Sequence, residues 1–141
     1  MELAAELKLE LTVEVDFGHL LDVGMTQTGH FRVIPITGGS FSGPGIKGSV
    51  IPGGADWSTM IDEKTAHVFA KYVIQTDDGV LISVENEGVM DITQPAMICT
   101  TPRFKVQKDS KYAWLQNGVF VGSLERAPDL SCVFIKIYKL S

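Results

Sequence analysis

Alternation of apolar and polar side chains over residues 7–17 constrains the fold of this chain more than any other feature. Leucine, valine and phenylalanine occupy the odd positions of this segment, and charged residues or threonine occupy the even positions. This period of two matches a β-strand, whose successive side chains point to opposite faces. A helix with the same sequence would spread the apolar side chains around its whole axis. The segment is therefore predicted to be a long strand with one apolar face.

The rest of the chain repeats short runs of strand-forming residues separated by turn signals. Asp77-Asp78-Gly79 and Asn117-Gly118 are typical of tight turns between strands. The one segment with a weak helical pattern, residues 22–28, contains Gly24 and is followed by Gly29. The pattern predicts a single all-β domain over residues 1–141, an antiparallel β-barrel of about nine to ten strands. Besides 7–17, the predicted strands are 30–37, 46–51, 57–61, 65–76, 80–87, 97–101, 104–106, 113–115, 119–125 and 131–140.

Residues 37–57 contain seven glycines and two prolines in 21 positions. Glycine is used where the backbone takes a positive φ or approaches another group closely. The segment is therefore either a set of corners in a strongly coiled sheet or the rim of a binding site. Under the second interpretation its candidate ligand-binding residues are Thr37, Gly53, Gly54 and Trp57.

Composition narrows the classes of partner. The chain has 141 residues and a net charge of −5, and its lysines and arginines are scattered. Nucleic acid and anionic membranes both require basic patches, so neither is an expected partner. No apolar stretch reaches the roughly 18 residues that span a membrane, and the N-terminal residues lack a signal-peptide core. We therefore expect a cytoplasmic protein.

Motifs for cofactors and metals are missing from the sequence. The glycines fit neither a dinucleotide-binding fingerprint nor a phosphate-binding loop, and there is no nucleophile elbow. The three histidines are isolated, whereas a metal site needs two or three ligands in register. We expect no cofactor and no metal.

Two residues are candidates for chemistry near the glycines. Asp56 follows Gly53-Gly54 and could act as a general base beside the flat wall of Trp57. Alternatively, Asp56 bonds backbone N–H groups in a turn and Trp57 plugs the barrel end. Arg32 lies in a strand, and if it faces the interior it requires a partner acid and could bind a ligand carboxylate or enolate. The alternative for Arg32 is an ordinary ion pair on the outer surface.

Further acids and aromatic residues extend the list of candidates. Glu85 and Glu87 end a predicted strand, and one of them is expected to point inward, where burial would raise its pKa; the alternative is solvated charge at the strand end. His30 is expected on the same face as Arg32. A second polar and aromatic set either closes over a ligand or plugs a strand edge, and its members are Arg103, Tyr112 and Trp114.

Several blocks together resemble the domain of unknown function 3237 family. They are Gly29–Arg32, Pro35–Gly39, Phe41–Pro44, Gly48–Trp57, Thr76–Gly79, Thr101–Phe104 and Tyr112–Leu115. The resemblance covers nearly the whole chain, and the Pro-Gly-Gly-Ala-Asp-Trp block is its most specific part. It implies a small antiparallel barrel of lipocalin-like proportions, often self-associated, and implies no activity. The chain departs from the family pattern at Val89, where a basic residue is usual, and at Gln116.

Three functions remain open at this point. The first is a small-molecule barrel, with cofactor-free acid–base chemistry such as isomerisation, cyclisation or hydration of an organic acid, ketone or aromatic metabolite. Its candidate catalytic residues are Arg32, Asp56, Glu85 and Glu87. The second is a carrier or sensor with the same pocket. The third is an assembly protein in which residues 7–17 pair between subunits, since a homo-oligomer is expected.

Overall fold

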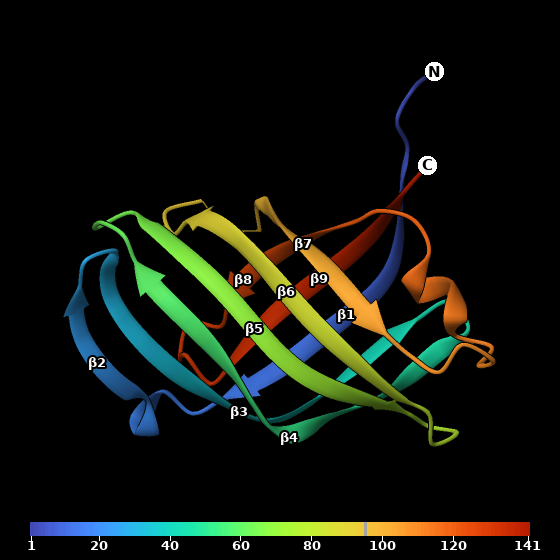
Figure 1. The fold of residues 1–141 in the computed structure, drawn as a ribbon, viewed down its shortest axis with the longest axis horizontal. Coiled ribbons are helices and arrows are strands. Elements are labelled where there is room, and N and C mark those ends of the chain that lie inside the picture. Colours follow the sequence, from blue (N-terminus) through green and yellow to red (C-terminus); the bar gives the residue numbers. More distant parts are fainter. Residues whose placement is uncertain (95) are drawn as a thin grey trace.

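The computed structural model describes residues 1–94 and 96–141 and shows one antiparallel sheet closed into a barrel (Figure 1). The strands follow the order β1-β9-β8-β7-β6-β5-β4-β3, and β1 pairs again with β3, so eight strands close the barrel and β2 lies outside it. The strands are β1 (Ala5–Val15), β2 (Leu21–Thr26), β3 (Gly29–Gly43), β4 (Ile46–Met60), β5 (Thr65–Thr76), β6 (Leu81–Asp91), β7 (Ile98–Lys105), β8 (Phe120–Arg126) and β9 (Cys132–Leu140). Two 3₁₀ turns complete the described elements, η1 (Phe17–His19) and η2 (Ala113–Gln116).

The all-β barrel predicted from the sequence is confirmed, and β1 shows why. Leu9, Leu11 and Val13 are at most 3% exposed, whereas Glu10 and Glu14, at even positions of the strand, are exposed. β1 pairs with β9 on one edge and with β3 on the other. From Glu10 to Glu14 both edges are therefore used within the chain, and the idea that the whole of residues 7–17 pairs between subunits is wrong.

Two observed strands run through a glycine or proline at which the sequence predicts that a strand ends. Residues 46–51 and 57–61 belong to one strand, β4, because a bulge between Ile51 and Ala55 absorbs the glycines. Residues 97–101 and 104–106 merge into β7 across Pro102. Among the described residues, β7 pairs with β8 only at Ile98 and Thr100. Pro102 therefore lies beyond the end of that ladder, where proline is tolerated.

One predicted strand is absent, and one observed strand is not predicted by the sequence. Residues 113–115 form part of η2 rather than a strand, since a run of three apolar residues has no readable period. Residues 22–28, with their weak helical pattern, largely form β2 and the turn that follows it. β2 pairs with the beginning of β3, which β1 does not reach.

The glycines of residues 37–57 act mainly as corners of the sheet. Gly39 has a φ of +135°, and a Cβ atom there would overlap the carbonyl oxygen of Thr12 on β1. This is the place where β1 meets β3 and the barrel closes, with register shifts on both sides of β3. Only glycine allows both that φ and that approach. The first of the two interpretations of this segment therefore describes the observed backbone.

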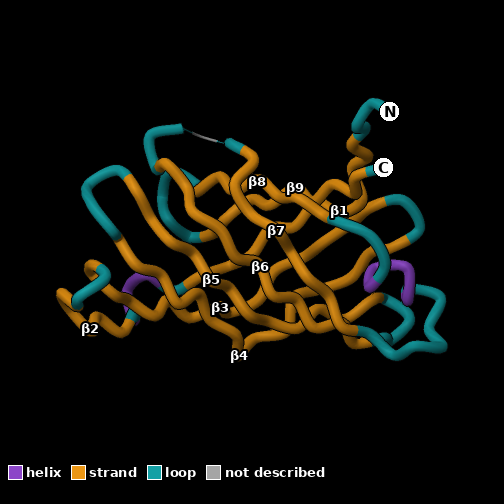
Figure 2. Tube along the Cα trace, turned by 45° about the horizontal axis from the view of Figure 1, so that its top comes forward, coloured by secondary structure: helices purple, strands orange, loops and turns teal. Residues whose placement is uncertain are grey.

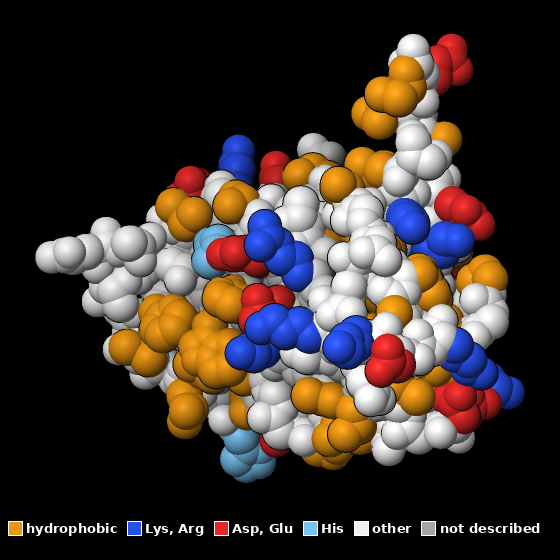
Figure 3. Space-filling view, turned by 45° about the vertical axis from the view of Figure 1, so that its right-hand side comes forward, with side chains coloured by type: hydrophobic (Ala, Val, Ile, Leu, Met, Phe, Trp, Pro, Cys, Tyr) orange, Lys and Arg blue, Asp and Glu red, His pale blue; other side chains and the backbone are white. Residues whose placement is uncertain are grey.

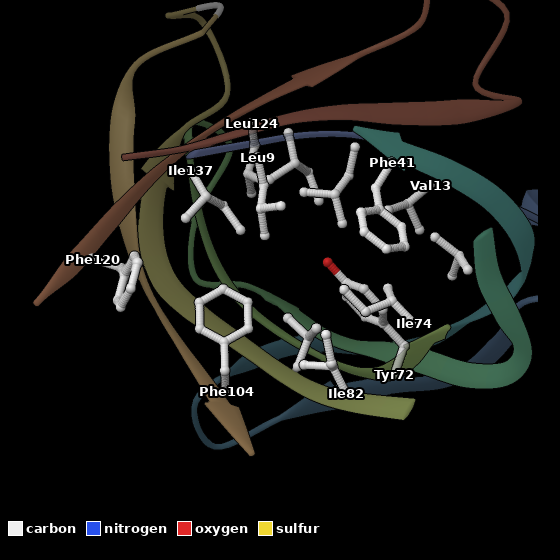
Figure 4. Close-up of a cluster of buried hydrophobic side chains, with 14 of the residues drawn as sticks. Leu9, Val13, Phe41, Tyr72, Ile74, Ile82, Phe104, Phe120, Leu124 and Ile137 are labelled. Atoms are coloured by element: carbon white, nitrogen blue, oxygen red, sulfur yellow. The ribbon is translucent and has the colours of Figure 1, made fainter. Parts of the chain in front are cut away.

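The two ends of the barrel differ. η2 and the aromatic residues beside it fill one end, where the Phe104 and Phe120 rings meet edge-on at 5.3 Å and Leu115 is 1% exposed. The side chains labelled in Figure 4 point into the interior and are apolar, except for the hydroxyl of Tyr72. Figure 2 shows η2 and η1 at opposite ends of the barrel. The end away from η2 is therefore the one left for a site.

Closure of the barrel can be tested by comparing two glycines with positive φ. We expect Gly39→Ala to lower the free energy of unfolding by more than about 3 kcal/mol, because it adds a backbone clash to the strain of the positive φ. Gly53→Ala is the control, since Gly53 has a φ of +114° but no atom within 4 Å of an added Cβ, and should cost about 1–2 kcal/mol. Chemical denaturation measures both values. Equal losses would show that close approach of β1 and β3 does not limit closure.

Candidate functional site

A cavity of about 50 Å³ lies inside the barrel. A cavity of this size has room for a few water molecules or for part of a small organic ligand. Its wall is mostly apolar, and the polar groups on it come from β4, β5, β6 and β8. The lining residues are Val13, Val15, Ile36, Asp56, Val68, Ala70, Tyr72, Asn86, Met90, Leu124, Arg126, Val133 and Ile135.

Asp56 is the carboxyl group of this cavity. On β4 it lies opposite Ile34 and Ala70, and Ile34 is buried on the inner face of the sheet. Its Oδ1 atom accepts a hydrogen bond from the Phe69 backbone N–H at 3.1 Å. Burial raises the pKa of Asp56, and this outweighs the opposing effects of the Phe69 N–H and of the nearby Arg126 and Arg32. The carboxyl group is therefore held closer to protonation than an exposed aspartate.

Arg32 lies one pleat further along the same face of β3 as Ile34. Its Nε and Nη2 atoms are buried and have no hydrogen-bond partner among the described residues. Ser58, opposite Arg32 on β4, is fully buried and its Oγ is equally unpartnered. Of the two interpretations of Arg32, the inward one matches its position. A buried N–H group without an acceptor costs about 1–3 kcal/mol, so a ligand that accepted hydrogen bonds from these atoms would bind favourably.

Arg126 is a charged residue of the site that the sequence did not single out, and neither did it single out the uncharged Tyr72, Asn86 and Thr100. Arg126 ends β8, lines the cavity, and places its guanidinium 5.7 Å from the centre of the Phe17 ring of η1. Burial lowers the pKa of Arg126, the positive charge of Arg32 lowers it further, and Asp56 raises it. Alternation from Phe120 through Gly122 and Leu124 would have placed this side chain on the inner face.

A second group of polar atoms lies deeper in the barrel. The Tyr72 hydroxyl, Asn86 Oδ1 and Thr100 Oγ1 are buried and unpartnered within the described part of the chain. Each of these residues is 2% exposed, and Figure 4 shows the Tyr72 oxygen pointing into the barrel. A Cβ atom on Gly122 would lie 2.5 Å from Thr100 Oγ1. An unsatisfied buried polar group costs about 1–3 kcal/mol, so three together indicate a ligand or ordered water.

The Tyr72 hydroxyl is a hydrogen-bond donor without a partner in residues 1–94 and 96–141. Burial, together with the negative charge of Asp56, raises the pKa of its phenol. The phenol therefore keeps its proton at neutral pH and is able to donate it in a hydrogen bond. The cavity thus combines a donor from Tyr72 with the carboxyl group of Asp56.

Glu85 and Glu87 do not face the cavity. Glu85 Oε1 lies 3.5 Å from Lys71 Nζ, and Glu87 Oε2 lies 2.8 Å from His67 Nε2, on the outer face of the barrel. Figure 3 shows acidic and basic side chains intermixed on that surface. The expectation that one of the two glutamates points inward is wrong, because residues two apart on a strand share a face. Asn86 between them is the inward residue.

The other residues predicted near the glycines lie outside the barrel. Trp57 is 39% exposed, and its ring lies 6.4 Å from that of Phe69. It neither walls the cavity nor plugs the barrel end, because it follows Asp56 on the strand and so points to the opposite face. Thr37 and Gly53 are exposed, and Gly54 lines a shallow outer groove with Gly53 and Trp57.

The remaining candidates are divided between the two ends. His30 is on the cavity end, where its Nε2 lies 2.6 Å from the exposed Asp22 carboxylate. Arg103 is exposed on β7. Tyr112 donates a hydrogen bond from its hydroxyl to Asp78 Oδ1 at 2.9 Å, and the Trp114 ring lies 6.4 Å from that of Phe120. Tyr112 and Trp114 thus belong to the filled end of the barrel and not to the cavity.

Residues 1–94 and 96–141 contain neither a cluster of metal ligands nor a helix that could span a membrane. That part of the chain contains no cluster of three or more histidine, cysteine, aspartate or glutamate side chains placed to hold a metal ion. Nor does it contain a helix with the length and apolar character needed to cross a bilayer.

Fold and cavity together define a class: small closed β-barrels with a partly polar interior. Within that class the chain belongs to the family described as protein of unknown function (DUF3237), whose model matches residues 5–140. This agrees with the resemblance seen in the sequence blocks.

Similar proteins are found among both sequences and structures. A UPF0311 protein of Rhodopseudomonas palustris is 34% identical over 139 residues, covering 88% of this chain and 90% of its own. The crystal structure of a conserved protein of unknown function from the same species has a TM-score of 0.87 at 30% identity, covering 100% of this chain and 99% of that one. An enzyme from Penicillium herquei has a TM-score of 0.78 at 22% identity, covering 100% and 96%, which shows a shared fold.

The raised pKa of Asp56 predicts a pH-dependent effect on stability. A raised pKa in the folded state favours folding at low pH, and this contribution is lost as the pH rises through the folded-state value. Near pH 7, Asp56→Asn should therefore raise the Tm by a few degrees, the shift that about 1 kcal/mol produces in a domain of this size. The difference in Tm between the variant and the native chain should vanish below pH 3.8, the ordinary pKa of an aspartate. Thermal unfolding followed by circular dichroism from pH 3 to 8 measures it, and a lower Tm at pH 7 would contradict it.

Proposed function

We propose that this protein binds a small organic molecule in the cavity and performs cofactor-free acid–base chemistry on it. One observation carries the proposal: the unpartnered buried polar groups of Tyr72 and Asn86 line a cavity that also holds a carboxyl group with a raised pKa. Interiors otherwise satisfy such groups, so their combination is typical of a functional site.

Asp56 would take and return the proton. A carboxyl group whose pKa is shifted towards the working pH is better matched to proton transfer than an exposed one. The Tyr72 and Thr100 hydroxyls can donate hydrogen bonds to a carbonyl oxygen and stabilise negative charge as it develops there. This combination suits isomerisation, cyclisation or hydration of an organic acid, a ketone or an aromatic metabolite. The Penicillium herquei protein adds only that a chain with this fold is described as an enzyme.

A carrier or sensor is the alternative function for the same cavity. Such a protein requires shape and an orienting group, but it does not require an acid or base with a matched pKa. The position of Asp56 favours the enzyme. In either case we expect the protein to act in the cytoplasm.

Deuterium exchange tests the proposal without a known substrate. A panel of small organic acids, phenols and ketones is incubated with the protein in D₂O, and loss of carbon-bound protons is followed by ¹H NMR. We expect exchange in at least one compound and a loss of about 100-fold or more in Asp56→Asn, the range that general acid–base groups contribute. Glu85→Gln, which changes an acid on the outer face, should exchange at the native rate.

The outcomes separate the two functions. Binding without exchange in the native protein would support the carrier. Exchange that survives in Asp56→Asn would remove Asp56 from its role. Loss of exchange in Glu85→Gln as well would indicate a general effect of surface charge.

Self-association is proposed through β2, which has one pairing partner among the described residues. Leu21, Val23 and Met25 on this strand are 65%, 60% and 80% exposed. An edge strand of this kind is able to pair with a second copy. Val23→Lys should convert an oligomer into a monomer, as measured by light scattering. Val89→Lys is the control, because it adds the same charge on β6, a strand that has a paired neighbour on each side. A native monomer would contradict this proposal.

A further inference from the structure

We propose that the ligand of this cavity is a small organic monocarboxylate whose carboxylate group is held by Arg32 and Arg126. The inference rests on the proposed function and narrows its ligand class. The positive charges of Arg32 and Arg126 outnumber the negative charge that Asp56 can supply. Arg126 lines the cavity together with Asp56, and Arg32 is a diagonal neighbour of Asp56 across the β3–β4 ladder. Neither arginine forms an ion pair within residues 1–94 and 96–141. Whether Asp56 is charged or neutral, at least one positive charge at the site is left over.

The acid opposite Arg32 on β2, Asp22, is already bonded, and Glu87 on β6 is paired on the outer face. Asp22 is close enough for Arg32 to lower its pKa, but its carboxylate bonds His30 and the Gly24 N–H and is 53% exposed. Glu87 pairs with His67 on the outer face. Solvent screens such exposed charges strongly. They do not replace a partner inside the barrel.

The free atoms of Arg32 identify the geometry of the missing partner. Nε and Nη2 lie on one edge of the planar guanidinium, and they are the two atoms without partners. That edge binds a carboxylate through two parallel N–H···O bonds. A neutral amide or an alcohol offers one acceptor to the same edge, and a cation is repelled by it.

Arg126 has a contact that does not depend on a ligand. Its guanidinium lies over the Phe17 ring of η1, a cation–π contact that uses none of its N–H groups for an ion pair. Its N–H groups, which project from the edges, stay available for an anion. Arg32 and Arg126 come from β3 and β8, which are not neighbours in the sheet, and each influences Asp56. An anion near both arginines therefore also lies near the proposed proton-transfer group.

The rest of the lining sets the body of the ligand. Val68, Met90, Leu124 and Val133 offer an apolar wall, and the cavity has about 50 Å³. These side chains suit a short hydrocarbon body. A second carboxylate would have to be buried against that wall, which is costly. Tyr72 and Thr100, deeper in the barrel, could hydrogen-bond one neutral oxygen of the ligand.

Matched pairs of compounds test the inference. The probes are acetate, 3-methylbutanoate, 2-oxobutanoate and benzoate, each compared with its neutral amide, and succinate. Calorimetry and ligand-observed NMR measure binding to the native chain and to Arg32→Gln, Arg126→Gln and Arg103→Gln. We expect at least one monocarboxylate to bind 10-fold or more tightly than its amide and than succinate. That difference should disappear in the first two variants and persist in Arg103→Gln, which changes an exposed arginine.

Arg32→Lys guards against a loss of folding. It keeps the positive charge but lacks the two-atom edge, so its carboxylate affinity should lie between those of the native chain and Arg32→Gln. Each variant is used only after its Tm shows a folded protein. Equal binding of amides and acids, undiminished binding in Arg32→Gln and Arg126→Gln, or no binding of any monocarboxylate would overturn the inference.

The test also separates this inference from the proposed function. Carboxylates that bind through both arginines but exchange no protons would support the ligand class and contradict the chemistry. Exchange in neutral ketones, with no carboxylate binding, would support the chemistry and contradict the ligand class.

Discussion

Closure between β1 and β3 is the constraint on which the rest of this structure depends. The two strands meet where Gly39 lets the β1 backbone approach at Thr12, and without that ladder the sheet would be open. Closure turns one face of each of the eight barrel strands into an interior from which water is largely excluded. In that interior a carboxyl group such as Asp56 resists ionisation, and hydrogen bonds and charges act more strongly than at the surface.

One set of strands serves two different purposes along the barrel. Near η2 the inner positions of β6 and β7 carry apolar residues such as Ile82 and Phe104, which pack tightly. Further along the same strands the inner positions become Asn86 and Thr100, and a cavity appears. Polar atoms without partners reduce stability, so the packed end has to compensate for the open one. The fold thus separates the packed end from the candidate site along one axis of the barrel.

Sequence patterns predicted the class of fold and only part of the site. Alternation in β1 was readable because it runs for many residues, and Asp56 and Arg32 were singled out because charge stood beside glycine or apolar residues. Arg126 was missed because alternation along β8 places it on the inner face but does not show which residues it meets there: it comes near Asp56 only through closure of the barrel. Trp57 was misplaced because adjacent residues on a strand face opposite ways. The two departures from the family pattern lie elsewhere, since Val89 is 51% exposed and Gln116 Oε1 accepts a bond from the Val106 N–H.

Surface and interior carry opposite charge, and this bears on how an anion would be recognised. The whole chain has a net charge of −5, so its long-range field opposes an approaching carboxylate. Affinity for an anion would then have to arise at short range, from guanidinium groups that burial has stripped of water. Composition alone therefore argued against an anionic partner for the surface while saying nothing of the interior. Selectivity obtained in this way favours molecules small enough to enter over larger polyanions, which a basic surface would attract first.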